Sequence, residues 1–202
     1  MCLLFETIKL KEGVFYNLDL HSERMNNARK TLFNANNKID LSKVLNLSDN
    51  YKKGLYKYRV EYNKDIIKTE AIPYVYRKIK TLQIVFNDEI DYTYKYANRA
   101  VFEEIRKKTM ADDILIIKKG LITDTSFTNV ALFNGNQWFT PFEPLLKGTK
   151  REELIRKRTI LEKKLIFSEI KQYKKIRLIN SMLNFDDQVD VEINNVLFNG
   201  KV

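Results

Sequence analysis

The positions of apolar and polar residues predict that the first half of the chain combines two helices with a β-rich meander. Met25, Ala28 and Leu32 recur at the three- and four-residue spacing of an amphipathic helix. Segments rich in Tyr, Val and Ile follow, with the alternation of strands. The expected helices cover residues 21–36 and 41–47, and the expected strands cover residues 3–10, 14–16, 55–62, 66–75 and 81–86. This order is typical of an α+β fold.

The second half of the chain alternates helices with short strands. Asn134-Gly135-Asn136 is a strong turn signal and predicts a hairpin around it. The expected helices cover residues 98–109 and 149–164, and the expected strands cover residues 114–117, 129–133, 137–139, 176–179 and 189–198. This alternation is closer to an α/β arrangement.

A shift in composition near residues 87–91 predicts a boundary between two domains. We expect a smaller N-terminal α+β domain at residues 1–87 and a larger C-terminal domain at residues 88–202. Ligand sites occur preferentially where domains meet. We therefore expect the functional site in the cleft between the two domains.

Length and composition describe a chain that can bury a sizeable core. Of its 202 residues, 44% are hydrophobic and 12% are aromatic, a content that disordered chains lack. No apolar run approaches the roughly 18–20 residues that span a bilayer, and the first residues lack the basic segment of a secretory signal. The single cysteine, Cys2, excludes an intrachain disulfide. We expect a cytoplasmic protein without a membrane partner.

The net charge of +10, from 36 Lys and Arg against 26 Asp and Glu, has two explanations. A basic chain can bind an anionic partner, and nucleic acid is the first candidate. The excess is mostly Lys, spread along a chain also rich in Asn and Ile, which is the composition that an AT-rich genome encodes. The runs Arg156-Lys157-Arg158 and Lys174-Lys175 lack interleaved aromatic residues. We therefore expect no nucleic-acid partner, although a binding protein on a basic scaffold stays an alternative.

Several common catalytic motifs are absent from the sequence. No stretch holds the closely spaced glycines of a phosphate loop. One Cys and one His cannot form a metal cluster, so we expect no metal. The lone His21 lies in a polar context at a helix start, which predicts an exposed structural residue. Glu103 and Glu104 are adjacent on a helix and face different directions, which predicts a solvated face.

Lys95 stands in an unusual setting, within DYTYKYANRAVFEEI. Alternation places Tyr92, Tyr94 and Tyr96 on one side of a predicted strand and Lys95 on the other, at the point where a helix follows. A lysine in a protected pocket loses its charge more readily, and its neutral amine can form a Schiff base. Taken alone, the same lysine is an ordinary exposed strand residue.

Two further segments suit an anionic, nitrogen-containing ligand. Asp124 follows a short strand, and a carboxylate buried there suits a cation such as a protonated pyridine nitrogen. The Thr- and Ser-rich loop after it can offer hydroxyls and backbone N–H groups to an anion. Gly148 and Thr149 open a helix whose first amides are a ready phosphate site. Each segment alone is also explained as a polar turn or a capped helix.

Together, in this order and spacing, these segments resemble the class IV aminotransferases, which are fold-type IV enzymes that use pyridoxal 5′-phosphate. The matching segments are LFETIKL, LHSERMNNA, KYANR, ITDTSFTNVALF with WFTP, LLKGTKREELI and LINSML. The resemblance covers most of the chain. It implies a two-domain fold with the active site in the interdomain cleft, pyridoxal 5′-phosphate as cofactor, and a homodimer.

The resemblance also implies roles for individual residues. The implied cofactor contacts are Arg24, Lys95, Asp124, Thr149, Lys150 and Ser181. Lys95 would be the catalytic lysine that binds the cofactor covalently, and Asp124 would pair with the pyridine nitrogen. Arg24, Ser181 and the amides at the helix start would bind the phosphate, while Asn129 would order the loop. Many members carry Glu where Asp124 stands, and most have an N-terminal hairpin before the segment that matches LFETIKL.

Two segments indicate which members the chain resembles most. The Lys-x-x-Asn-Arg pattern from Lys95 to Arg99 resembles the 4-amino-4-deoxychorismate lyases, as does Asn180-Ser181-Met182. This resemblance implies conversion of 4-amino-4-deoxychorismate, a small anionic substrate, to 4-aminobenzoate and pyruvate in folate biosynthesis. The alternative is a branched-chain or D-amino-acid aminotransferase of the same family, which would share every cofactor residue.

Overall fold

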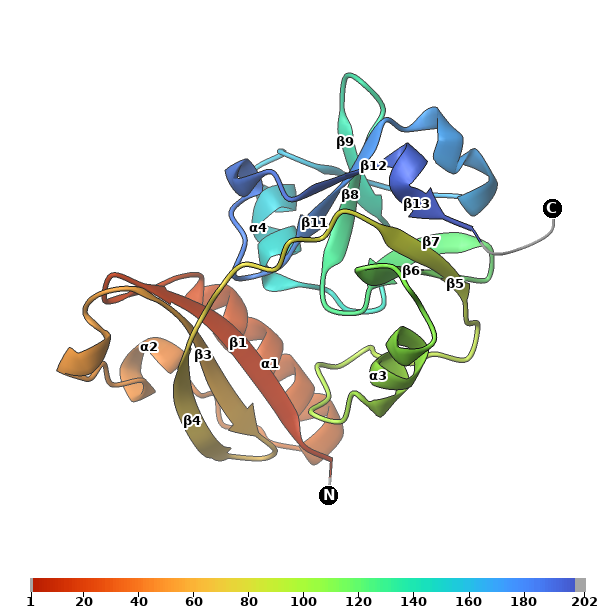
Figure 1. Ribbon diagram of the computed structural model, residues 1–202. Coiled ribbons are helices and arrows are strands. Elements are labelled where there is room, and N and C mark those ends of the chain that lie inside the picture. Colours follow the sequence, from red (N-terminus) through yellow and green to blue (C-terminus); the bar gives the residue numbers. More distant parts are fainter. Residues whose placement is uncertain (1, 199–202) are drawn as a thin grey trace. The chain divides into compact units, whose positions relative to one another are not determined.

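The computed structural model describes residues 2–198 and divides them into two compact units (Figure 1). The first unit contains the described residues up to Tyr76 together with Tyr94–Asn98. The second contains Arg77–Thr93 together with the described residues from Arg99 onward. Each unit has its own sheets and core, and each is considered by itself below.

The units divide at residues 76 and 77, whereas the sequence predicted a boundary at residues 87 and 88. The difference comes from strand β5 (Leu82–Phe86), which pairs in parallel with β6 (Asp113–Lys118). Leu82 is fully buried in the core of the second unit. The hydrogen bonds and the apolar side chains of β5 therefore assign it to the second unit.

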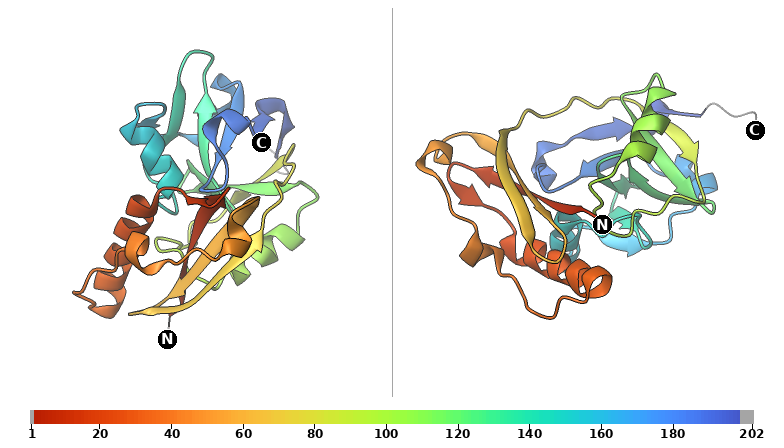
Figure 2. Two further views of the ribbon diagram at one scale, coloured as in Figure 1. Left: turned by 90° about the vertical axis from the view of Figure 1, so that its left-hand side faces the viewer. Right: turned by 90° about the horizontal axis from the view of Figure 1, so that it is seen from below.

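A four-stranded antiparallel sheet in the order β2-β1-β3-β4 forms the first unit. Its elements are β1 (Leu4–Lys11), β2 (Val14–Phe15), α1 (Leu18–Phe33), α2 (Leu41–Val44), the 3₁₀ helix η1 (Asp49–Tyr51), β3 (Leu55–Tyr62) and β4 (Ile66–Pro73). In Figures 1 and 2 the red-orange helix α1 lies along one side of this sheet. Alternate residues of β1 and β3, such as Ile8 and Val60, pack there against Met25 and Ala28 of α1.

Residues 94–98 do not form the strand predicted around Lys95. A single bridge joins Tyr96 to Leu4, and Phe5 N donates to the Lys95 carbonyl at 3.0 Å. Tyr92 belongs to the second unit, so the three alternating tyrosines do not share a strand. The backbone of Lys95 is nevertheless tied to β1 at its N-terminal end.

Two sheets form the second unit, ordered β10-β9-β8-β11-β12 and β13-β5-β6-β7. The remaining elements are α3 (Ala100–Lys107), β7 (Leu121–Thr125), β8 (Asn129–Phe133), β9 (Trp138–Pro141), α4 (Thr149–Arg156), β10 (Leu161–Lys163), η2 (Phe167–Gln172), β11 (Lys175–Ile179), η3 (Phe185–Asp187), β12 (Asp190–Glu192), η4 (Ile193–Asn195) and β13 (Val196–Leu197). Side chains from both sheets share one apolar core, with Leu115, Val130 and Ile176 among its fully buried residues.

The largest differences from the predicted elements of this unit are at α4 and at residues 189–198. Helix α4 ends at Arg156 and not at residue 164, because Arg158 adopts a left-handed conformation with φ 56°. The following residues form β10, which adds in parallel to β9. The strand predicted at residues 189–198 divides into β12, η4 and β13. No helix in the described part of the chain combines the length and the apolar character that a membrane span requires.

Candidate active site

Asp124 lies at the end of β7 with its carboxylate buried, since only 4% of the residue is exposed. Its Oδ1 accepts a hydrogen bond from Asn129 Nδ2 at 2.8 Å, and its Oδ2 accepts one from the Leu146 amide at 2.9 Å. Burial raises the pKa of Asp124 to about 6, although these hydrogen bonds act to lower it. Among residues 2–198, no cationic side chain forms an ion pair with this carboxylate. A cation from outside the chain could therefore compensate the buried negative charge of this carboxylate.

Asn129 links the separate parts of this site. Besides bonding Asp124, its Nδ2 donates to the Leu146 carbonyl at 2.7 Å. A Cβ on Gly148 would lie 2.0 Å from Asn129 Oδ1, so the start of α4 packs directly on this side chain. In the sheet, Asn129 is paired with Ile179, two residues before Ser181. The structure thus brings Asp124, the helix start and the Ser181 turn together around Asn129.

Replacing Gly148 with alanine tests this packing. The added Cβ would overlap Asn129 Oδ1, and the displaced amide would lose its bond to Asp124. We expect a loss of about 1–3 kcal/mol in the free energy of unfolding, measured by urea denaturation. In an Asn129→Ala background the same substitution should cost clearly less. An equal cost in both backgrounds would contradict the proposed overlap.

Helix α4 presents its first amides at this position. The first intrahelical bond runs from Glu152 N to the Gly148 carbonyl, so the amides of Lys150 and Arg151 point out of the helix start. The Lys150 ammonium pairs with Glu153 at 2.7 Å. The group of Lys150 that is suited to an anion is therefore its backbone amide and not its side chain. The buried Arg151 anchors the helix by donating to the Pro141 carbonyl at 2.7 Å.

The turn after β11 is folded by a side chain. Asn180 Oδ1 accepts from the amides of Met182 and Leu183 at 2.9 and 3.1 Å. Ser181 is therefore at the tip of a fixed turn that begins next to Asn129. This placement suits the phosphate contact that the resemblance implies for Ser181, which stays a prediction.

In the first unit, Lys95 is half-buried beside β1. Its Nζ lies 4.8 Å from the centroid of the Phe5 ring. Burial lowers the pKa of the His21 imidazole, and the positive charge of Lys95 acts in the same direction. The lysine is thus held on the same unit as a second cluster of charged residues.

That cluster consists of Glu6, His21 and Arg24. Glu6 is fully buried and accepts from His21 Nδ1 at 2.7 Å and from Arg24 Nε at 3.0 Å, with Arg24 Nη2 bound to its second oxygen. Burial alone would raise the pKa of Glu6, but the charge of Arg24 and the His21 hydrogen bond hold it at about 2. The prediction that His21 is exposed was wrong, because Glu6 supplies a buried partner that the sequence context did not indicate.

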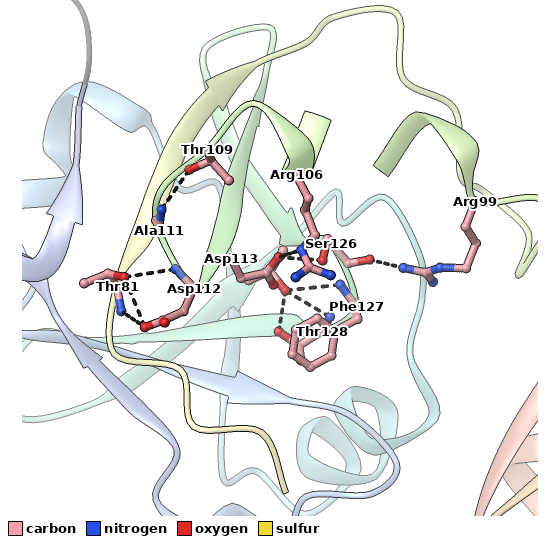
Figure 3. A network of polar contacts seen from close by, with 11 residues as sticks. Thr81, Arg99, Arg106, Thr109, Ala111, Asp112, Asp113, Ser126, Phe127 and Thr128 are labelled. Carbon is pink, nitrogen blue, oxygen red and sulfur yellow. Dashed lines mark hydrogen bonds and ion pairs between the residues drawn. The ribbon is translucent and has the colours of Figure 1, made fainter. Parts of the chain in front are cut away.

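A third network holds the loop that follows Asp124 (Figure 3). Arg99 Nη2 donates to the Ser126 carbonyl, and Ser126 Oγ donates to the buried Asp113 at 2.5 Å. Thr125 Oγ1 accepts from the amides of Phe127 and Thr128 at 3.3 and 3.1 Å. The sequence predicted that this loop offers hydroxyls and amides to an anion. The Thr125 and Ser126 hydroxyls and the Phe127 and Thr128 amides instead form hydrogen bonds within the protein. The network instead orders the segment between Asp124 and Asn129.

Comparison with known proteins places these features in one family. The model of the amino-transferase class IV family matches residues 92–185. An uncharacterized protein of Haemophilus influenzae is 30% identical over 182 residues, which are 89% of this chain and 97% of the relative. The crystal structure of a "putative 4-amino-4-deoxychorismate lyase" from Haemophilus somnus has a TM-score of 0.81 at 33% identity, covering 90% of this chain and 97% of that chain.

The fold is shared more widely than the sequence. The branched-chain amino acid aminotransferase from Escherichia coli is only 12% identical, yet its structure has a TM-score of 0.72 over 96% of this chain and 76% of that chain. The mixed α/β, fold-type IV architecture expected from the sequence is thereby confirmed. With a relative at 30% identity that the chain covers almost completely, and with the family model matched across the Lys95 to Ser181 segments, the chain belongs to the class IV aminotransferase family.

Proposed function

We propose that this protein is a pyridoxal 5′-phosphate-dependent lyase that converts 4-amino-4-deoxychorismate to 4-aminobenzoate and pyruvate. The observation that carries the proposal is the buried Asp124 carboxylate, which accepts two hydrogen bonds but forms no ion pair with a side chain in the described part of the chain. The choice of a lyase rests on the Lys95-to-Arg99 pattern and on Asn180, whose side chain folds the turn at Ser181.

The residues present fit this cofactor. Asp124 would keep the ring nitrogen protonated, which also removes the cost of a buried unpaired carboxylate. The Lys150 amide, the Thr149 position at the helix start and Ser181 would hold the phosphate. When bound, pyridoxal 5′-phosphate supplies an electron sink for the carbon that carries the substrate amine.

Arg24 would add a guanidinium to the phosphate site, and its orientation is set by the buried Glu6. Glu6 accepts from Nε and Nη2 of Arg24, which fixes the orientation of the planar guanidinium. Arg24 stays protonated in this pair. The pKa of about 2 keeps Glu6 ionised throughout the working pH range.

Lys95 would move the proton in the reaction. Its Nζ takes the proton from the carbon that bears the amine, and the electron pair left there forms the aromatic ring as the bond to the enolpyruvyl oxygen breaks. The same Nζ then returns a proton to the methylene carbon of the leaving enolpyruvate, which gives pyruvate. Because aromatisation drives this direction, the chain's main task is to position the reacting groups.

A product assay tests the proposal directly. The protein loaded with pyridoxal 5′-phosphate should release 4-aminobenzoate and pyruvate in equal amounts from 4-amino-4-deoxychorismate, as measured by chromatography and a coupled pyruvate assay. Absence of 4-aminobenzoate, together with efficient amino transfer from a branched-chain or D-amino acid to a 2-oxo acid, would replace the lyase with the aminotransferase. A colourless protein without affinity for the cofactor would overturn both.

A further inference from the structure

Arg59 lies on the face of the first unit's sheet that is turned away from α1. It occupies the middle of β3, between Tyr58 and Val60, whose side chains enter the core. In the antiparallel register Arg59 is opposite Thr7, and Phe5 is opposite Glu61. Residues directly opposite one another share a face, so Arg59 and Phe5 lie together on the side away from the core.

The guanidinium of Arg59 is oriented but only partly bonded. Its Nε donates to Glu61 Oε1 at 2.8 Å, and its central carbon lies 4.0 Å from the centroid of the Phe5 ring. The side chain is only 21% exposed. Among residues 2–198, no group accepts a hydrogen bond from Nη1 or Nη2. A planar fork with both terminal nitrogens available is the geometry that binds a carboxylate through two parallel bonds.

The same ring connects Arg59 with the predicted catalytic lysine. Lys95 Nζ is 4.8 Å from the Phe5 centroid, so both cations lie within 5 Å of one aromatic ring. Lys9 and Lys57, which are paired in the register, share this face and add positive charge. Glu61, and Glu70 opposite Arg59 in the register with β4, offset part of it, while Lys68 opposite Glu61 adds a further positive charge. This part of the sheet therefore favours an anionic group close to the amine of Lys95.

We propose that Arg59 binds a carboxylate of the substrate through Nη1 and Nη2, and this inference rests on the proposed function. In 4-amino-4-deoxychorismate the ring carboxylate is para to the amine-bearing carbon. A substrate whose amine-bearing carbon is next to Lys95 would reach Arg59 with that carboxylate across Phe5. Arg59 would thus select a carboxylated ring and fix its orientation, whereas Lys95 performs the chemistry.

Kinetics of an Arg59→Gln variant test the assignment. We expect a rise of about 10- to 100-fold in KM for 4-amino-4-deoxychorismate, the loss typical of a charge-assisted hydrogen bond, with kcat changed by only a few-fold. Arg59→Lys keeps the charge without the planar fork, so its KM should lie between the values for wild type and Arg59→Gln. Lys30→Gln is the control, because Lys30 is an exposed cation of α1 on the other side of the same sheet.

Cofactor binding separates a carboxylate from a phosphate as the ligand of Arg59. Titration of the apoprotein with pyridoxal 5′-phosphate should give the same affinity, within about twofold, for wild type, Arg59→Gln and Lys30→Gln. A large loss of cofactor affinity in Arg59→Gln alone would assign Arg59 to the phosphate and would overturn the proposal.

A binding measurement keeps this inference separate from the lyase proposal. Calorimetric titration of the cofactor-loaded wild type with 4-aminobenzoate and with 4-aminobenzamide compares two ligands that differ in the carboxylate. We expect wild type to prefer the acid by about tenfold or more and Arg59→Gln to lose that preference. This result without any 4-aminobenzoate production would sustain the carboxylate site while overturning the lyase.

Other outcomes count against Arg59. Equal affinity of wild type for the acid and the amide, or binding of neither, would overturn the assignment even if the lyase reaction is found. So would a preference for the acid that survives in Arg59→Gln. The wild-type comparison and Arg59→Lys keep the test decisive if Arg59→Gln fails to fold.

Discussion

Lys95→Ala is expected to lower turnover of 4-amino-4-deoxychorismate by about 10³- to 10⁴-fold or more, the largest effect of any single substitution. In the proposed reaction the variant would lose both the amine that attaches the cofactor and the base that moves the proton, and each contributes orders of magnitude. The visible absorbance band of the covalently attached cofactor should disappear in the same variant. Absorbance spectra and the product assay measure the two losses independently.

The controls for Lys95 follow from its position. Lys30, an exposed lysine of α1 on the opposite side of the same sheet, provides a matched Lys30→Ala variant that should keep both the band and the activity. Added methylamine should restore part of the turnover of Lys95→Ala, since a small amine can replace the missing base. A Lys95→Ala protein that is coloured and active would refute the assignment.

Asp124→Asn is expected to lower kcat by about 10²- to 10³-fold, comparable with the loss of a preorganised charge at a reacting centre. The neutral amide cannot keep a pyridine nitrogen protonated, so the cofactor would accept electrons less readily. Asp124→Glu restores the residue that many family members carry and should retain more activity than Asp124→Asn. Steady-state kinetics at saturating cofactor distinguish the two variants, and equal activity of Asp124→Asn and wild type would exclude the proposed pairing.

The pH dependence of stability provides a second measurement on Asp124. Its pKa is about 6 in the folded protein against 3.8 ordinarily, so the folded state holds this proton to higher pH than the unfolded chain does. Stability must therefore fall as pH rises from about 4 to 6, by about 2–3 kcal/mol from this group.

Urea unfolding of the cofactor-free protein at pH 4, 5, 6 and 7 measures this change. Asp124→Asn, which does not titrate, should lack the decline, and bound pyridoxal 5′-phosphate should suppress it in wild type by supplying a cation. A wild-type protein whose stability rises over this interval as much as that of Asp124→Asn would contradict the raised pKa.

The local elements were largely predictable from the sequence. The strand predicted at residues 55–62 is β3 with the same bounds, because its alternation has one face in the core. The hairpin around Gly135 also forms between β8 and β9. These features depend on contacts between near neighbours, which hydrophobic periodicity and turn residues record directly.

The extent of α4 and the division of the chain could not be predicted in this way. Helical spacing continues past Arg156 in the sequence, but β10 instead completes the edge of a sheet beside β9. Likewise β5 pairs with β6, although residues 87–112 separate the two strands in the chain. Such pairings are decided by distant hydrogen-bond partners, which no local pattern specifies.

The family was thus contained in the sequence, because it is recorded in the order and spacing of the motifs, and the same motifs supplied the candidate cofactor residues. Only the tertiary structure showed that Asn129 joins Asp124 to the start of α4, and that Glu6 buries His21 and aligns Arg24. It also decided the position of Arg59 beside the ring that Lys95 contacts. Positive charge is abundant along the whole chain, but folding places Lys95 and Arg59 at the same aromatic ring. It also leaves the terminal nitrogens of Arg59 without an acceptor among the described residues, which is why these two cations stand out from the others.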